Sequence, residues 1–247
     1  PLDKKTVADM KLRLKRFCML SAVVLLVLIG LLSTFMRFSH QQIKETAFEN
    51  RVSRNRAILK KDADTIEEEF NQLKQQLSVL AGSICGRAPS DPLVKQHLFR
   101  SYRRTAPLTY ASYRIDKEGR IAAMYPVNSD AIGQDISYQE HMKQISERHK
   151  PVISNAFMAV EGFPAVTVHV PVMRAGGYDG TVAFLIDLSR FAECFIQGSV
   201  QFFDALYLVD ECDKLVYTPQ PELLMGPAQA VIQPNKQGKA FIIKHTI

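Results

Sequence analysis

An uninterrupted apolar stretch near the N-terminus constrains the fold of this chain more than any other feature. Residues 17–36 (FCMLSAVVLLVLIGLLSTFM) contain no Asp, Glu, Lys or Arg. As a helix, a segment of this length rises about 30 Å, which matches the hydrocarbon core of a membrane. A core helix would show a polar stripe, and a secretory signal peptide has a shorter apolar region before a small-residue cleavage site. We therefore predict a transmembrane helix over residues 17–38.

The charges beside this stretch predict its orientation. Residues 1–16 carry six basic and two acidic side chains, whereas only Arg37 and Lys44 follow soon after the span. Because Lys and Arg are enriched in cytoplasmic segments, residues 1–16 are expected to form a cytoplasmic tail, with the remaining chain on the other side of the membrane. This tail holds most of the net charge of +6, so the basic composition does not indicate a nucleic-acid partner.

A long helix is predicted to follow the span. Residues 41–81 contain no Gly or Pro and are rich in helix-forming residues, which predicts a stalk helix within residues 39–87. Apolar residues in its second half are spaced alternately by four and three positions, which is an a/d stripe. They are Ile66, Phe70, Leu73, Leu77, Leu80 and Ile84. We expect a homodimer through this stalk near the membrane and packing against the chain's own domain farther out; a single long packing helix is the alternative.

Beyond the stalk, the pattern changes from helix to strand. A short helix is expected at 93–104 and another at 138–148, where the composition is helical. Segments rich in β-branched and aromatic residues, separated by turn signals, predict strands at 108–115, 119–125, 152–158, 164–173 and 181–187. Weaker strand patterns follow at 204–209, 214–217 and 239–244, and the chain ends within them, so we expect a fragment. A short antiparallel sheet with helices packed on it is an α+β fold.

Four segments of this region carry a resemblance to a known family. They are YASYRIDKEGRIAAMYP (110–126), IGQDISYQEHMKQI (132–145), ISNAFMAVEGFPAVTVHVPVM (153–173) and DGTVAFLIDLSRF (179–191). Together they resemble the double Cache sensor domains of bacterial chemoreceptors, sensor histidine kinases and diguanylate cyclases. The resemblance implies a membrane-distal, PAS-like ligand-binding module at 88–193 and a partial membrane-proximal module at 194–247. It also implies a receptor in the bacterial inner membrane, with its sensor domain in the periplasm or outside the cell.

At one position this sequence departs from the pattern of the family's amino-acid-binding members. Those members carry an arginine and aromatic residues at the start of the helix that corresponds to 138–148, where this chain has Tyr138, Gln139, His141 and Met142. A guanidinium binds a carboxylate through two parallel hydrogen bonds, which an amide cannot reproduce. An amino-acid ligand is therefore doubtful, and the sequence leaves the ligand unassigned.

Strand alternation predicts a pocket independently of the resemblance. Along 165–172, the valines at even positions share one face, suited to a helix, while Ala165, Thr167 and His169 share the other. A few polar groups among apolar walls are typical of a small-molecule site. The predicted ligand-binding residues are Tyr125, Tyr138, His141, Thr167 and His169, followed by Lys143, Arg174 and Asp187. Each of them could instead be a surface polar residue or a hydrogen-bonded core residue.

Other chemistries lack a sequence signal. The histidines form no HExxH motif, the cysteines form no Cys-x-x-Cys motif, and neither a phosphate-binding loop nor a nucleophile elbow occurs. We expect no metal, no cofactor and no catalysis, with any catalytic output domain beyond residue 247. Cys194 and Cys212 could form a disulfide or remain free thiols. The predicted function is ligand sensing by a membrane-anchored receptor; the alternative is a membrane-anchored protein-recognition or scaffolding domain.

Overall fold

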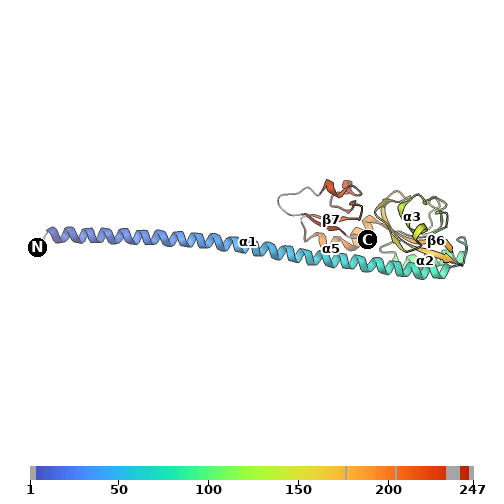
Figure 1. The fold of residues 1–247 in the computed structure, drawn as a ribbon, viewed down its shortest axis with the longest axis horizontal. Coiled ribbons are helices and arrows are strands. Elements are labelled where there is room, and N and C mark those ends of the chain that lie inside the picture. The colour runs from blue at the N-terminus through green and yellow to red at the C-terminus, as the bar shows by residue number, and fades with distance from the viewer. Residues whose placement is uncertain (1–3, 176, 204, 232–239, 245–247) are drawn as a thin grey trace. The chain divides into compact units, whose positions relative to one another are not determined.

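The N-terminal half of the chain is dominated by one helix. The structure is a computed structural model that describes residues 4–175, 177–203, 205–231 and 240–244 (Figure 1). Its contacts divide the chain into two units, residues 1–56 and residues 57–247. Helix α1 (Lys4–Ile84) forms the described part of the first unit and the beginning of the second. Its N-terminal portion is long and apolar enough to cross a membrane, and its apolar window is fully exposed.

The second unit contains an antiparallel sheet of six strands with helices on both faces (Figure 1). The strand order is β2-β1-β6-β5-β3, and β4 also pairs with β5. Its elements are α2 (Pro92–Thr105), β1 (Ala111–Ile115), β2 (Ile121–Tyr125), α3 (Glu140–Arg148), β3 (Val152–Ile153), β4 (Phe157–Met158), β5 (Pro164–Arg174) and β6 (Gly177–Asp187). The α+β prediction is confirmed. Two predicted strands differ from the structure: β6 begins at Gly177, four residues before the predicted strand at 181–187, and the predicted strand at 152–158 is divided into β3 and β4.

The two faces of this sheet belong to two different cores. Alternate residues of β5, from Val166 to Val172, pack with Val182, Phe184 and Ile186 of β6 against α1 and α2. The predicted a/d stripe of α1 lies in this core, and all six of its residues are buried. The opposite face, which includes Ala165, Ala183 and Leu185, packs with α3. The stripe is therefore covered by the chain's own sheet and is not available to a second subunit.

A tight turn between β1 and β2 positions the segment that leads into α3. Asp116 accepts hydrogen bonds from the backbone N–H groups of Gly119 (3.1 Å) and, through its side chain, Arg120 (2.7 Å). Gly119 has a φ of +86°, and a Cβ there would lie 2.6 Å from Cβ of Ser137. Only glycine combines this backbone conformation with such a close approach. The carbonyl of Gly119 accepts a hydrogen bond from Ile136 N (2.9 Å), which holds the approach to α3 against the sheet.

A second, three-stranded sheet follows, with the order β8-β7-β9. Its elements are α4 (Leu188–Phe195), α5 (Gln197–Val200), β7 (Ala205–Val209), β8 (Leu215–Tyr217), the short helices η1 (Pro221–Leu223) and η2 (Ala228–Ala230), and β9 (Ala240–Lys244). Strand β9 runs parallel to β7, whereas β8 is antiparallel to it. Residues 204 and 239, which begin two of the predicted strands, lie outside the described residues, as does residue 247, the end of the predicted membrane-proximal module. The thiols of Cys85, Cys194 and Cys212 are free, so the disulfide alternative is wrong.

A buried carboxylate joins the second sheet to the first. Asp210, at the end of β7, is fully buried and accepts the backbone N–H groups of Cys212 and Lys214, each at 2.9 Å. Its other oxygen accepts the N–H of Ala156 (3.0 Å), immediately before β4. The Lys214 ammonium donates to the carbonyl of the same Ala156 (3.4 Å). The turn after β7 thus holds Ala156, just before β4, through both the N–H and the carbonyl of that residue.

Replacing Asp210 by alanine is expected to loosen this junction. Three backbone N–H groups lose their acceptor, one of them buried, which should lower the free energy of local opening by about 2–4 kcal/mol. Hydrogen exchange of the purified chain in detergent measures this effect at the amides of Ala156, Cys212 and Lys214. The control is Glu211→Ala at the exposed neighbouring position, which should change these amides by less than about 0.5 kcal/mol. Equal protection in both variants would contradict the role assigned to Asp210.

Candidate functional site

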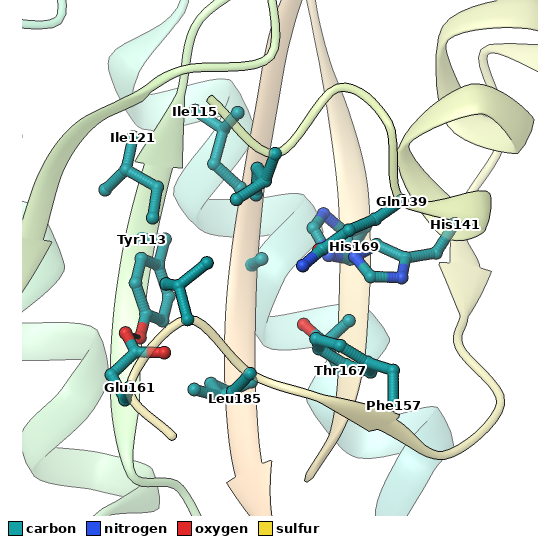
Figure 2. A pocket seen from close by; sticks show the side chains of 14 residues that line it. Tyr113, Ile115, Ile121, Gln139, His141, Phe157, Glu161, Thr167, His169 and Leu185 are labelled. Carbon is teal, nitrogen blue, oxygen red and sulfur yellow. Dashed lines mark hydrogen bonds between the residues drawn. The ribbon is translucent and has the colours of Figure 1, made fainter. Parts of the chain in front are cut away.

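A small pocket lies on the sheet face opposite α1 (Figure 2). Its walls come from β1, β2, β5, β6, the start of α3 and the segment from β4 to β5. Most of the lining is apolar, with five polar side chains and one carboxylate among it. The lining residues are Tyr113, Ile115, Ile121, Ile136, Gln139, His141, Phe157, Ala159, Val160, Glu161, Thr167, His169, Ala183 and Leu185. The cavity between them measures about 30 Å³, which is room for roughly two water molecules.

Two buried histidines form one side of the pocket, with Gln139 beside them (Figure 2). His169 comes from β5 and His141 from the first turn of α3; their ring centroids are 4.8 Å apart. Phe157 of β4 lies against His141 at 4.7 Å. Burial lowers the pKa of His141 to about 4, and burial together with the nearby His141 holds the pKa of His169 well below its usual value. Both imidazoles are therefore neutral at pH 7.

One polar atom of this pair lacks a partner. Nδ1 of His169 is buried and has no hydrogen-bond partner among the residues that the structure describes. The side chain as a whole is only 2% exposed. An unpaired buried polar atom is unfavourable by about 1–3 kcal/mol, so such atoms are usually explained by a ligand, a water or a functional role.

A tyrosine and a glutamate form the other side of the pocket (Figure 2). Tyr113 of β1 donates its hydroxyl to Oε1 of Glu161 at 2.5 Å. Glu161 lies in the turn between β4 and β5, which closes through hydrogen bonds from Ala159 N to Phe163 O and from Gly162 N to Ala159 O. Burial, and then the charge of Glu161, raise the pKa of the Tyr113 hydroxyl far above its ordinary value. The tyrosine therefore stays protonated and acts as a donor.

Three of the eight predicted ligand-binding residues line the pocket: His141, Thr167 and His169. Thr167 is partly engaged in the fold, because its hydroxyl donates to Phe184 O (2.9 Å) and its N–H donates to Ser154 Oγ (2.9 Å). The Thr167 hydroxyl has thus used its one donor on the fold and can offer a ligand only an acceptor.

The other five predicted residues lie elsewhere. Tyr125 pairs with Ser112, so it faces the α2 side of the sheet, where it packs on Phe99 and Tyr102. Tyr138 is 64% exposed. Lys143 and Arg174 are also exposed. Asp187 caps α4 by accepting the N–H of Ser189 at 2.7 Å. The structure does not bring these five residues into the pocket.

Three polar residues of the pocket, Tyr113, Gln139 and Glu161, were not among the predicted ligand-binding residues. Tyr113 could have been found, because the alternation applied to β5 also places Tyr113, Ala111 and Ile115 on one face of β1. Glu161 lies in a turn without periodicity, so no pattern in the sequence assigns it to the site. Among the described residues, no group of three or more His, Cys, Asp or Glu side chains could hold a metal ion.

Comparisons with known proteins agree with this architecture. Residues 66–187 match the family model described as "HK/GC/Chemotaxis protein-like, sensor domain". The fold is similar to an extracellular ligand binding receptor from Desulfohalobium retbaense, with a TM-score of 0.63 and 24% identity over 70% of this chain. This chain spans only 32% of the length of that receptor. The search of curated proteins found no match.

Two chemoreceptor domains from Pseudomonas have the same fold. The ligand-binding domain of the Pseudomonas aeruginosa amino acid chemoreceptor PctC, solved with GABA, has a TM-score of 0.58 and 16% identity over 71% of this chain and 80% of its own. That of the Pseudomonas fluorescens chemoreceptor CtaA, solved with L-alanine, has a TM-score of 0.55 and 17% identity over 70% of this chain and 73% of its own. At these identities the likeness concerns the fold.

Acidification is expected to destabilise the protein through His141. Its pKa is lowered in the folded state, so the unfolded chain takes up a proton first as the pH falls below about 6.5. The stability that neutral His141 contributes is present above that pH and is lost progressively down to about pH 4. The loss amounts to about 3 kcal/mol. Denaturant unfolding of the chain in detergent, followed by circular dichroism at several pH values, measures it.

The variant His141→Gln should show a shallower loss of stability on acidification than the wild type. His40→Gln, at an exposed position on α1, is the control and should follow the wild-type curve. An unchanged pH profile in His141→Gln would contradict the assignment of this stability to His141.

Proposed function

We propose that the chain is the extracytoplasmic ligand-sensing portion of a membrane-anchored bacterial receptor, and that residues 66–187, which match the sensor-domain model of histidine kinases, cyclases and chemotaxis proteins, form its Cache-type sensor domain. The observation that carries this proposal is the pocket on the sheet face opposite α1. It combines apolar walls with a few buried polar groups, one of which has no partner among the described residues. This is the composition expected of a site for a small solute.

The same sheet supports a route from the pocket to α1. His169 and Thr167 of β5 line the pocket, while Val168 and Val170, on the other face of the strand, pack in the core that contains the α1 stripe. A ligand that favours one position of β5 therefore also favours one packing of the valines on α1. A ligand can shift such an equilibrium only by its differential affinity for the two arrangements.

The membrane arrangement is part of this proposal. Residues 17–38 would span the inner membrane, residues 1–16 would remain in the cytoplasm, and the sheet domains would lie in the periplasm. The support is the exposed apolar portion of α1, together with the basic residues before it.

Ligand binding can be tested with the whole chain in nanodiscs. Thermal melting is followed by circular dichroism in the presence of amines, carboxylates, amino acids, purines and sugars. A ligand at about 100 times its dissociation constant should add nearly 3 kcal/mol of stability, which raises the Tm by several degrees. His169→Ala, inside the pocket, should lose this response. Lys143→Ala, at an exposed position on the same helix as His141, should keep it.

The outcome also separates sensing from protein recognition. If no class of solute stabilises a folded chain, small-molecule sensing is overturned, and the same fold would serve to recognise another protein instead. A response that survives in His169→Ala and disappears in Lys143→Ala would mean that the ligand binds outside this pocket.

The homodimer is proposed to form through the stalk before Ile66, because the stripe from Ile66 onward is buried in the chain's own core. Ile43 and Phe48 are large apolar residues exposed in that earlier part of α1. Single cysteines introduced between residues 39 and 56, in a background without other cysteines, should form cross-linked dimers in membranes at positions that repeat with the helix period. Absence of cross-linking throughout this range would contradict the proposal.

A further inference from the structure

The charge of the pocket restricts its ligand. Glu161 is the one acidic residue in the lining; no Lys or Arg lines the pocket, and both histidines are neutral. Arg114 follows Tyr113 in β1 but lies on the opposite face, where it pairs with Asp179 at 3.1 Å. The pocket therefore presents one negative charge, without a cation beside it in the lining.

The carboxylate of Glu161 is held in place but not neutralised. Its partner is the hydroxyl of Tyr113, which donates one hydrogen bond to Oε1. A neutral phenol orients a carboxylate and leaves its charge in place. A carboxylate in largely apolar surroundings favours a positively charged partner, and a charge-assisted hydrogen bond from an ammonium group is the strong form of that interaction.

The opposite side of the pocket offers a neutral hydrogen-bonding atom. Nδ1 of His169 is buried without a partner among the described residues, and the side chain of Gln139 lies nearby (Figure 2). A neutral imidazole presents either a donor or an acceptor at this nitrogen, so it can pair with a hydroxyl group. It cannot balance a carboxylate as a guanidinium does.

The size of the pocket limits the carbon skeleton between these two ends. The cavity measures about 30 Å³, and isoleucine and leucine side chains form much of its wall. A short aliphatic chain fits such a wall without leaving buried polar groups unpaired.

We propose that this pocket binds a small organic amine that lacks a carboxylate, with its ammonium group on Glu161 and a hydroxyl or similar neutral group on His169. This inference rests on the proposed sensing function and specifies its ligand class. A ligand carboxylate would be repelled by Glu161 and would lie among neutral groups without a counter-charge. The pocket therefore selects against free amino acids as well as for amines.

Isothermal titration calorimetry of the whole chain in nanodiscs tests this selection with matched probes. Ethanolamine and aminopropanol carry an ammonium and a hydroxyl group; glycine and β-alanine have the same chain lengths with a carboxylate in place of the hydroxymethyl group. Ethylene glycol and glycolate lack the ammonium. We expect an amino alcohol to bind at least about tenfold more tightly than each of the other probes, because only it pairs the carboxylate without adding an unpaired anion.

Two substitutions separate the charge from the shape of the site. Glu161→Gln keeps the size of the side chain but removes its charge, and it should weaken amine binding by about tenfold or more. Glu147→Gln, at an exposed position on α3, is the matched control and should bind like the wild type. Tyr113→Phe keeps the carboxylate but removes the hydrogen bond that orients it, so a smaller loss is expected. Hydrogen exchange across β5 and β6 verifies that each variant is folded.

The outcomes distinguish this inference from the proposed function. If glycine, β-alanine or glycolate binds and the amino alcohols do not, the ligand class is overturned while the sensing function stands. If a folded Glu161→Gln binds the amine as tightly as the wild type, the role of Glu161 is overturned. If neither these probes nor any solute of the wider library binds, the sensing function itself falls.

Discussion

The packing of the α1 stripe against the valine face of the sheet is the contact on which the rest of the second unit depends. Ile66 to Ile84 contribute one fully buried residue per helical turn, and β5 and β6 contribute alternate residues to the same core. Burial of apolar side chains is the main stabilising term in such a domain, at roughly 25 cal/mol per Å². Side chains alternate between the two faces of the sheet along each strand. The residues that pack on α1 therefore determine which residues point to the other face.

That second face can hold a pocket because the first face already supplies the core. Small residues such as Ala165 and Ala183 leave room between α3 and the sheet, and His169, Thr167 and Tyr113 place polar groups there. Desolvation keeps both histidines neutral, so their charge does not oppose folding at neutral pH. The result is a neutral side and an anionic side that face each other across apolar walls.

The sequence predicted elements and faces better than the particular site residues. Four of the five strands expected from 108 to 187 are present, because β-branched residues and turn signals mark the strands and Gly119 marks its turn; the fifth, at 152–158, is divided into β3 and β4. His141, Thr167 and His169 line the candidate pocket and were predicted together because they lie on regular elements whose periodicity indicates a face. Tyr125 lies on the α2 side of the sheet, because the register of β2 against β1 decides which face it takes. Glu161 could not be found, because its place depends on how a turn folds over the sheet.

The position of Glu161 depends in turn on contacts outside the first sheet. The segment that carries Phe157 and Glu161 begins at Ala156, whose N–H and carbonyl are both bound by the second sheet, through Asp210 and Lys214. A ligand larger than the present cavity could be accommodated by moving this segment away from His141 and His169. Such a movement works against the hydrogen bonds to Ala156, so it is resisted by the second sheet as well as by the pocket itself. Under the proposed sensing function, two local sets of contacts, the valines on α1 and the Asp210 junction, would therefore respond to the same ligand from opposite sides of the pocket.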